Sequence, residues 1–460
     1  MKRNDCFKFL AASVVLIVAA NAALAQSATA PLAANAEQAS AYTRLIDSAN
    51  GTAADALVRY ALEHNGELQA ARKTIAEARG RLLQSGLKPN PMIEASGTQA
   101  VNSPDNIQMI GVELPLEPGG RRKARVAVAE REVEMREAEV RDFERRLAAD
   151  VRTKYAEALA ASRNLKFIEE LLGLTRDSYR LIRARVELGK SAALDQNLVW
   201  VELNKTDATR IGFESKAEIA MLELKKVIGM PPDETLRLRG EFDLSRQPPP
   251  QDEALRRALE SRPDLAALRA AESVAAAQAR QARVEGKIDA SLFANYQRMS
   301  FGYDVRGFND AGALVPVTGV FHNLTFGVRL TLPARNKNQG LIEAALAAEE
   351  AARKRREFAE LVARNEVAAA YARMEKAQEA LAVYRDRVRE TAMGNLDVMR
   401  KAYELGRNNL LDYIAEQRRF IEVETSYTDL LKERLSALIE IERAAGLPLL
   451  LAEPKIKVEN

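Results

Sequence analysis

Residue types that commonly carry out chemistry are scarce in this 460-residue chain. The two histidines, His64 and His322, stand far apart, and neither has other candidate ligands at the spacing of a metal site. The pair Gly119-Gly120 is not followed by the lysine and hydroxyl residue of a phosphate-binding loop. The many carboxylates lie in charged stretches typical of solvated helix faces. We therefore expect no catalytic centre, no metal site and no cofactor, and we predict that the chain is not an enzyme.

Two acidic residues occupy matching positions beyond glycine-containing turns. Asp195 lies six residues after Gly189, and Asp412 lies six residues after Gly406. A glycine at a helix end often adopts the left-handed conformation that stops the helix. A carboxylate in the first turn of the next helix stabilises the partial positive charge at that terminus. The pattern predicts two helical hairpins, each with an acid on its returning helix.

The N-terminal residues 1–25 have the pattern of a secretory signal peptide. A basic start precedes an apolar run, which ends in the tripeptide Ala23-Leu24-Ala25, the small-x-small pattern of a cleavage site. Cys6 would be removed with this segment, so we expect a mature chain without a thiol and without a lipidated cysteine. Residues 26–51 would form the N-terminal segment of the mature chain.

The composition is that of long helices. Basic residues number 68 and acidic residues 65, a formal net charge of +3, which leaves no basic footprint for nucleic acid. Aromatic residues make up only 5% of the chain, which favours long helices or coiled coils over a compact globular core. After the predicted signal peptide no apolar window reaches about eighteen residues, so we expect no transmembrane helix.

The chain contains an internal duplication. Ala61–Leu68 returns as Ala258–Leu265, and Gly111–Leu116 returns as Gly327–Leu332. In the same order follow Glu187–Lys190 with Glu404–Arg407, and Ile228–Pro231 with Ala445–Pro448. The predicted organisation is a first repeat at 52–229, a proline-rich linker at 230–251, a second repeat at 252–446 and a C-terminal tail at 447–460.

Each repeat is predicted to contain a helix, a β-hairpin, a long helix and a returning helix. Apolar residues of the long helices step by three and four, the pattern of a coiled-coil seam. At a rise of about 1.5 Å per residue, the longest uninterrupted helix is a rod of about 100 Å. The first repeat has predicted helices Thr52–Leu87, Gly120–Leu188 and Leu194–Gly229 and strands Met92–Val101 and Ile107–Leu116. The second has helices Asp252–Gly286, Asn338–Leu405 and Leu410–Gly446 and strands Ile288–Met299 and Leu324–Leu332.

The predicted strands alternate apolar and polar side chains, as membrane-spanning strands do. Leu324, Phe326 and Val328 share one face, and Arg329 lies on the other. A half-buried strand of a soluble sheet would show the same period. Four strands cannot close a barrel, and unpaired edges are not tolerated in lipid, so membrane strands would require several subunits to share one barrel. The segment Phe301–Asn323 is predicted to be an external loop.

This duplicated order of elements resembles the TolC-like outer-membrane efflux family over nearly all of the mature chain. The run Tyr403–Asp412, Y-E-L-G-R-N-N-L-L-D, is similar to the family's second helical turn, and the ending Leu438–Gly446 is similar to its heavy-metal-efflux branch. The resemblance implies a fold that is mainly α with a small β part. In that fold, duplicated long α-hairpins form a trimeric α-helical barrel in the periplasm, topped by a shared twelve-strand transmembrane β-barrel with four strands from each chain.

The resemblance also implies partners and a location. The expected assembly is a homotrimer that contacts outer-membrane lipid and has a large periplasmic portion. It would dock a periplasmic adaptor (membrane fusion) protein and an inner-membrane pump of the proton-driven type, and it would bind no nucleic acid. By the same resemblance, Gly189, Lys190, Gly406 and Arg407 form the periplasmic tips that meet the adaptor.

The resemblance assigns a periplasmic gate to the residues just inside the tips. Asp195 corresponds to a gate-holding partner of Tyr403, and Asp412 to a ring that lines the closed pore. The chain departs from the family pattern at Asn408, where an arginine links neighbouring helices, and at Ala415, where some members carry a second pore acid. We therefore expect a weaker latch than in relatives that keep the arginine.

The predicted function is the outer-membrane exit duct of a tripartite efflux system, which passively conducts substrates from the adaptor and pump to the exterior. Heavy-metal ions are one candidate substrate. A periplasmic adaptor and a periplasmic coiled-coil scaffold without a pore are the alternatives. Two full hairpins argue against the adaptor, which has one hairpin flanked by β-rich modules. Fractionation distinguishes a channel that requires detergent from a freely soluble scaffold.

Overall fold

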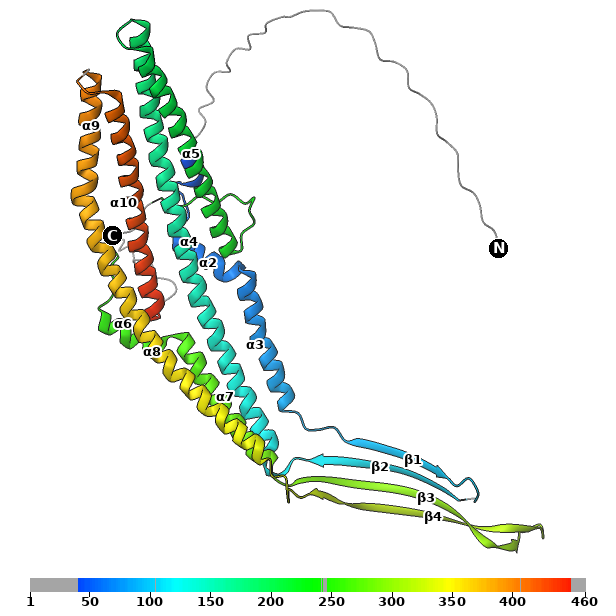
Figure 1. The fold of residues 1–460 in the computed structure, drawn as a ribbon. Helices are drawn as coiled ribbons and strands as arrows, with labels where there is room; N and C mark the ends of the chain where they lie inside the picture. Colours follow the sequence, from blue (N-terminus) through cyan, green and yellow to red (C-terminus); the bar gives the residue numbers. More distant parts are fainter. Residues whose placement is uncertain (1–39, 104, 241, 243–245, 406, 448–460) are drawn as a thin grey trace, which may run out of the picture. The chain divides into compact units, whose positions relative to one another are not determined.

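The computed structural model describes residues 40–103, 105–240, 242, 246–405 and 407–447. The predicted signal peptide, most of the N-terminal segment, Gly406 and nearly all of the C-terminal tail lie outside the described residues. The described residues belong to one compact unit, which is mainly helical and contains one four-stranded antiparallel sheet (Figure 1).

The first repeat follows the predicted order, with one interruption. The expected helix Thr52–Leu87 is two helices, because the backbone at Asn65 is extended (φ −65°, ψ 119°). The elements are α1 (Ala41–Leu45), α2 (Ala54–His64), α3 (Gly66–Ser85), β1 (Met92–Gln99), β2 (Asn106–Leu116), the 3₁₀ turn η1 (Pro118–Gly120), α4 (Arg121–Glu187) and α5 (Ala193–Ile228). The 67-residue helix α4 is a rod of about 100 Å, as its length predicts.

The second repeat has the same order and a matching interruption at Arg262 (φ −62°, ψ 125°). Its elements are α6 (Gln251–Ser261), α7 (Pro263–Glu285), β3 (Asp289–Phe308), β4 (Leu314–Thr331), α8 (Gln339–Val383), the π-helical segment η2 (Tyr384–Arg389), α9 (Glu390–Glu404) and α10 (Leu410–Ala445). The long helix predicted over Asn338–Leu405 therefore contains a wider helical turn that the apolar periodicity did not indicate.

The prediction of an external loop over Phe301–Asn323 is wrong. Strands β3 and β4 continue through most of it and pair up to Phe308 and Leu314, with a register shift between Gly302 and Arg306. The glycines in this segment suggested a loop, but its aromatic and β-branched residues favour extended backbone. The hairpin connection is thus much shorter than expected.

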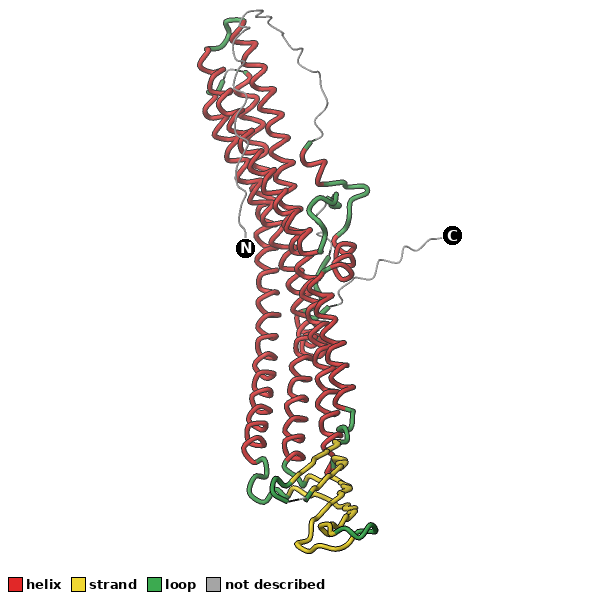
Figure 2. The backbone as a smooth tube through the Cα atoms, turned by 90° about the vertical axis from the view of Figure 1, so that its right-hand side faces the viewer, coloured by secondary structure: helices red, strands yellow, loops and turns green. Residues whose placement is uncertain are grey.

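Helix α4 is the central element of the helical part. It packs against α3 and α5 of its own repeat and, across the repeats, against α7 and α10, and the helices run side by side in Figure 2. The largest apolar cluster joins α2, α3, α4 and α5 where the helices of the first repeat meet. Its fully buried members include Leu57, Val58, Leu68, Val151, Leu224 and Ile228. The coiled-coil seam predicted from the apolar spacing therefore supplies the core.

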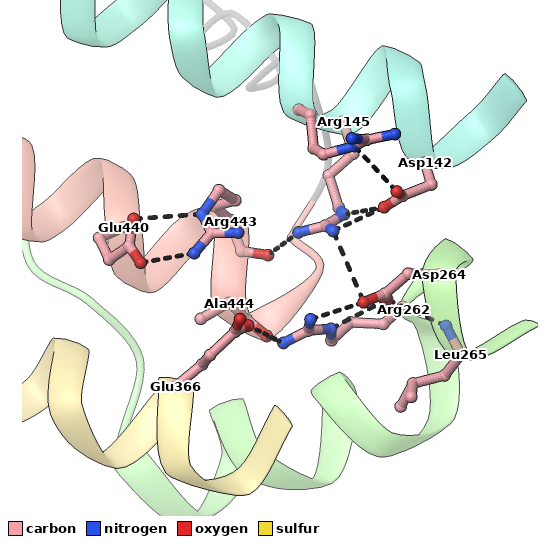
Figure 3. A network of polar contacts seen from close by, with 10 residues as sticks. Asp142, Arg145, Arg262, Asp264, Leu265, Glu366, Glu440, Arg443 and Ala444 are labelled. Atoms are coloured by element: carbon pink, nitrogen blue, oxygen red, sulfur yellow. Dashed lines mark hydrogen bonds and ion pairs between the residues drawn. The ribbon is translucent and has the colours of Figure 1, made fainter. Parts of the chain in front are cut away.

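The helix break in the second repeat is surrounded by a polar network (Figure 3). Arg262, whose exposed fraction is 3%, donates hydrogen bonds to Glu366 at 2.7 Å and to Asp264 at 2.7 Å. It also donates to the carbonyl of Ala444 at 3.3 Å. Arg145 of α4 donates to the carbonyl of Arg443 at 2.6 Å. The network therefore ties the first repeat to the second through α4, α7, α8 and α10.

Candidate functional site

One face of the sheet is apolar across all four strands. Antiparallel partners lie on the same face, and the register places Ile93 beside Val112, Val112 beside Ala294, and Ala294 beside Phe326. A second row consists of Ala95, Ile110, Tyr296 and Leu324. The exposed fractions of Ile93 and Phe326 are 77% and 79%. Such a broad exposed apolar surface marks an interaction site rather than the outside of a water-soluble sheet.

The apolar band has a defined end. Beyond Tyr296, the next residues on the same face are Arg298 on β3 and His322 on β4, which pair with each other in the register. The Tyr296 hydroxyl and His322 Nδ1 are 2.6 Å apart in a hydrogen bond. An aromatic side chain at the boundary between apolar and polar rows is typical of a membrane–water interface. His322, predicted to lie in a loop, is therefore a strand residue.

The opposite face of the sheet is polar and contains an ion pair. Glu113 of β2 accepts hydrogen bonds from Ser291 of β3 and Arg329 of β4. The Arg329 guanidinium also lies over the Phe293 ring, 5.5 Å from its centroid. The alternation predicted for the strands is thereby present as two chemically distinct faces. The two outer strands, β1 and β4, each have one edge without a partner strand in the described sheet.

No described helix is both long enough and apolar enough to cross a bilayer.

The first hairpin turn ends α4 with a glycine. Gly189 has φ +69°, and the amide of Lys190 donates to the carbonyl of Arg185 at 2.7 Å, which closes the left-handed helix end expected there. A Cβ atom on Gly189 would meet nothing within 4 Å. Gly189 and Lys190 are both exposed. The turn is therefore open to a partner, and the backbone conformation accounts for the glycine.

The second hairpin turn has a related geometry. The amide of Arg407 donates to the carbonyl of Ala402 at 2.8 Å. Asn409 caps α10, with its side-chain oxygen accepting from the Asp412 amide at 2.8 Å. Asn408 is exposed and donates to the Met399 sulfur at 3.1 Å. Asn408 thus makes a short contact within its own hairpin.

Two of the candidate gate residues, Tyr403 and Asp195, interact between the two hairpins near their turns. Tyr403 packs on an apolar cluster that includes Ile182 and Val199 of the other hairpin. Its ring stacks on that of Tyr413, with centroids 5.9 Å apart and planes 4° from parallel. Burial, and next the negative charge of Asp195, raise the pKa of the Tyr403 hydroxyl. Among the described residues, Tyr403 and Asp195 share an electrostatic interaction but no hydrogen bond.

The two acids occupy matching places. Asp195 and Asp412 both lie in the first turn of a returning helix, α5 and α10. In this position each carboxylate stabilises the positive end of its helix. Asp195 is half-buried beside the hairpin interface, whereas Asp412 is exposed. The structure therefore brings Asp195 to Tyr403 and leaves Asp412 on the surface of the chain.

Sequence reasoning missed the residues that bridge the two hairpins. Arg185 near the end of α4 donates to the carbonyl of Glu404 at 2.7 Å. Further along, Arg418 of α10 forms an ion pair of 2.6 Å with Glu202 of α5, whose side chain is 8% exposed. No spacing signal marks these residues, because each partner belongs to a different repeat. Tyr413, buried against Tyr403, was also missed.

Within the part of the chain that the structure describes, no group of three or more histidine, cysteine, aspartate and glutamate side chains is arranged to hold a metal ion.

Comparison with known proteins identifies the family. A family profile described as "Outer membrane efflux protein" matches residues 57–230 and 254–447, well over half of the chain. The chain belongs to this outer membrane efflux protein family. The predicted resemblance to the TolC-like efflux channels is thereby confirmed. Because these family members are channels, the prediction that the chain is not an enzyme is confirmed as well.

Relatives with recorded roles include metal-resistance proteins. The chain is 22% identical over 395 residues to the cobalt-zinc-cadmium resistance protein CzcC of Cupriavidus metallidurans, covering 85% of this chain and 89% of that protein. It is 30% identical over 118 residues to the nickel-cobalt-cadmium resistance protein NccC of Alcaligenes xylosoxydans xylosoxydans, which covers 26% of this chain.

Solved structures of outer-membrane channels share the fold. A structure of CusC matches with a TM-score of 0.71 at 19% identity, covering 86% of this chain and 92% of that one. The open state of the Neisseria gonorrhoeae MtrE outer membrane channel matches with a TM-score of 0.68 at 20% identity, covering 86% and 89%. The predicted fold class, mainly helical with duplicated long hairpins and a small antiparallel sheet, is confirmed.

Proposed function

We propose that this chain is one subunit of a homotrimeric outer-membrane exit duct, which passively conducts substrates from a periplasmic adaptor and an inner-membrane pump to the exterior. The observation that carries the proposal is the sheet: an apolar face continuous over four strands, a polar face behind it, and two unpartnered edges. Open edges do not occur in lipid, so strands β1 and β4 must pair with other copies. Three copies would then form a shared barrel of twelve strands.

If the proposal is right, the protein should need detergent for extraction and should have the mass of a trimer. Native mass measurement of the detergent-extracted protein should give a homotrimer, and fractionation should recover it from the outer membrane. A freely soluble chain would favour the coiled-coil scaffold instead. A monomer or dimer as the only species would contradict the shared barrel.

We propose heavy-metal ions as the exported substrate. The support comes from two relatives, the cobalt-zinc-cadmium resistance protein CzcC and the nickel-cobalt-cadmium resistance protein NccC. In this role the metal is cargo and needs no resident site. Deletion of the gene should lower tolerance to these ions, and the intact gene should restore it. Unchanged tolerance to all of them, with increased sensitivity to drugs, would assign a different substrate.

We propose that the two hairpin tips, with Gly189, Lys190, Gly406 and Arg407, dock the adaptor. The exposed turn at Gly189 supports this, because nothing within the described chain covers it. Gly189→Glu or Gly406→Glu should leave trimers in the membrane and abolish export, since a bulky charge would occupy the docking surface. Normal export by both variants would mean that the tips are structural turns only.

We propose that Tyr403 and Asp195 hold the resting duct closed, and that Asp412 forms a ring that sets cation preference. The support is the electrostatic interaction of Asp195 with Tyr403 and the exposed first-turn position of Asp412. The described chain shows no hydrogen bond between these two side chains. In the closed trimer a charge-assisted hydrogen bond between them would contribute about 1.5–3 kcal/mol, and three copies would bias a two-state closure. Asn408 contacts Met399 within its own hairpin, which fits a weak latch.

Single-channel recording tests the gate. Tyr403→Phe combined with Asp195→Ala should raise conductance in planar bilayers and admit large antibiotics to cells. Asp412→Asn should weaken cation preference without opening the duct, because a carboxylate ring attracts cations. Unchanged conductance of the double variant would refute the latch, and unchanged selectivity of Asp412→Asn would refute the ring.

A further inference from the structure

The polar face of the sheet contains four charged side chains. This number refers to the described strand residues that lie between the helices and the register shift of β3 and β4. The register assigns them to this face, because Glu94 of β1 pairs with Gly111, Gly111 with Asn295, and Asn295 with Thr325. The four are Glu94, Glu113, Asp289 and Arg329, one on each strand. Arg298 and His322 lie on the opposite face.

Three of these charges are neutralised within the chain. Glu113 is paired with Arg329 across β3. Asp289 forms an ion pair of 3.1 Å with Arg121 at the start of α4. Glu94 is exposed and has no ion pair or hydrogen-bonding side chain among the described residues. Each copy of the polar face therefore carries one uncompensated negative charge, and it is located on Glu94.

The residues that lie beside Glu94 in the sheet register provide no positive charge for its carboxylate. A Cβ atom at Gly111 would lie 2.2 Å from Asn295 Oδ1, so the side chain of Asn295 extends over the bare backbone of β2 toward β1. The neighbours of Glu94 in this row are thus a glycine, an amide and a hydroxyl residue. None of them carries a positive charge that could cancel the carboxylate.

We propose that Glu94 is a specificity-determining residue of the duct, at a position separate from the hairpin tips. The inference rests on the proposed function, because the polar face becomes the lumen only when several copies close the sheet. Three copies would then place three carboxylates around the lumen at one level. A ring of carboxylates concentrates cations and repels anions at close range. Passing substrates would therefore meet a second cation-attracting level inside the sheet, beyond the Asp412 ring.

Reversal potentials in planar bilayers with a KCl gradient test this assignment. Glu94→Gln in the full-length protein should lower the cation-to-anion permeability ratio at least about twofold at low salt, since fixed lumen charge acts within the Debye length. Glu94→Lys should lower it further. The effect should persist in an Asp412→Asn background, where the proposed tip ring is absent, and it should shrink as ionic strength rises. Glu234→Gln, which removes an exposed acid from the linker between the repeats, is the matched control and should leave the ratio unchanged.

The outcomes separate the two proposals. Channels with wild-type selectivity in both Glu94 variants would overturn the Glu94 ring and leave the exit duct intact. A rise in cation preference for Glu94→Gln would also overturn it, because this would mean that the side chain neutralises a cation on the neighbouring copy. Failure of the wild-type trimer to form channels would overturn the exit duct and, with it, the ring.

Discussion

The two repeats break their first helix at matching positions but stabilise the break with different chemistry. The backbone angles of Asn65 and Arg262 agree within a few degrees. Asn65 is neutral: its side-chain oxygen accepts from the Leu68 amide at 2.9 Å, and its amide group donates to the carbonyl of Val227 at 2.9 Å. Arg262 is a buried cation between the carboxylates of Asp264 and Glu366. The same backbone conformation is thus stabilised by two hydrogen bonds of a neutral side chain in one repeat and by a cluster of charged residues in the other.

The comparison of Asn65 with Arg262 shows what charged residues add to the second helix break. The break itself needs only a residue that satisfies nearby backbone groups, as Asn65 does. Arg262 also holds α8 through Glu366 and α10 through Ala444, and Arg145 extends the contacts to α4 of the first repeat. The second break therefore serves as the junction between the repeats. Its charged residues add polar contacts between α4, α7, α8 and α10 to the apolar packing of these helices.

Replacement of Arg262 should have the largest effect. Arg262→Ala removes the partner of Glu366 and the nearer of the two partners of Asp264. Removal of one member of a buried pair typically costs about 3–5 kcal/mol. The midpoint of denaturant unfolding of the detergent-solubilised protein should fall accordingly. Arg262→Lys should be intermediate, because lysine keeps the charge but not the forked geometry. A loss no larger than that of Asn65→Ala would contradict the distinction between the two breaks.

The second-largest effect should come from alanine substitutions at Gly229 and Gly446, the glycines that lie against the two helix breaks. Gly229 has φ +77°, and a Cβ there would lie 2.9 Å from the carbonyl oxygen of His64. Gly446 has φ +65°, and its nearest contact would be Arg262 Cγ at 3.2 Å, on a side chain that can move. Alanine should cost about 1–2 kcal/mol at either site for the left-handed conformation, and more at Gly229 because backbone cannot yield. Equal unfolding midpoints for Gly229→Ala and Gly446→Ala would remove this contrast.

Replacement of Asn65 should have a smaller effect than that of Arg262. Asn65→Ala removes a helix cap and one further hydrogen bond, a loss of about 1–2 kcal/mol. Asn65→Asp keeps the acceptor for the Leu68 amide and should recover part of the loss. Thermal unfolding of both variants measures this recovery. If Asn65→Asp is as unstable as Asn65→Ala, the bond to Val227 rather than the cap stabilises the break.

A fall in pH should destabilise the break at Arg262 more than the break at Asn65, and this is the smallest of the expected effects. Burial favours a higher pKa for Asp264, but the hydrogen bond and charge of Arg262 outweigh it and lower that pKa below its usual range. A hydrogen bond from Arg443 likewise lowers the pKa of Glu440. A lowered folded-state pKa stabilises the fold above the unfolded value, about 4, and that stabilisation is lost as the pH falls through the folded value.

The unfolding midpoint should therefore drop below about pH 4. The drop should be smaller in Arg262→Ala, because Arg262 is the main group that lowers the pKa of Asp264, and it should be unchanged in Asn65→Ala. Midpoints measured between neutral pH and pH 3 provide the comparison. The same acid sensitivity in all three proteins would mean that carboxyl groups outside the network cause it.

Local patterns were enough for most of the fold. The apolar steps of three and four predicted α4 almost to the residue, and the alternation around Leu324 and Phe326 predicted the two-faced sheet. The break at Asn65 was missed because its surroundings include Val227 and Gly229, which lie far along the chain. The break at Arg262 had a local signal, because Pro263 follows it and a residue before proline disfavours the helical conformation. The extension of β3 and β4 beyond Phe301 was missed because glycine content obscured a pairing that only the partner strand reveals.

Among the candidate sites, the glycine at position 189 and the first-turn acids followed from helix-terminus chemistry, which acts within a few residues. The electrostatic interaction between Tyr403 and Asp195 was expected only from the family resemblance, since the two residues belong to different repeats.

Spacing along the chain was sufficient to predict the duplication, the lengths of the long helices and the apolar and polar faces of the strands. The pairing of β2 with β3, which places the two repeats in one sheet, became visible only in the three-dimensional arrangement. The same packing pairs Arg329 with Glu113, a residue 216 positions away, whereas Glu94 has no charged partner among the described residues. The physical reason is that a charge pair depends on which segments long-range packing brings within a few ångströms, and periodicity contains no information about that choice.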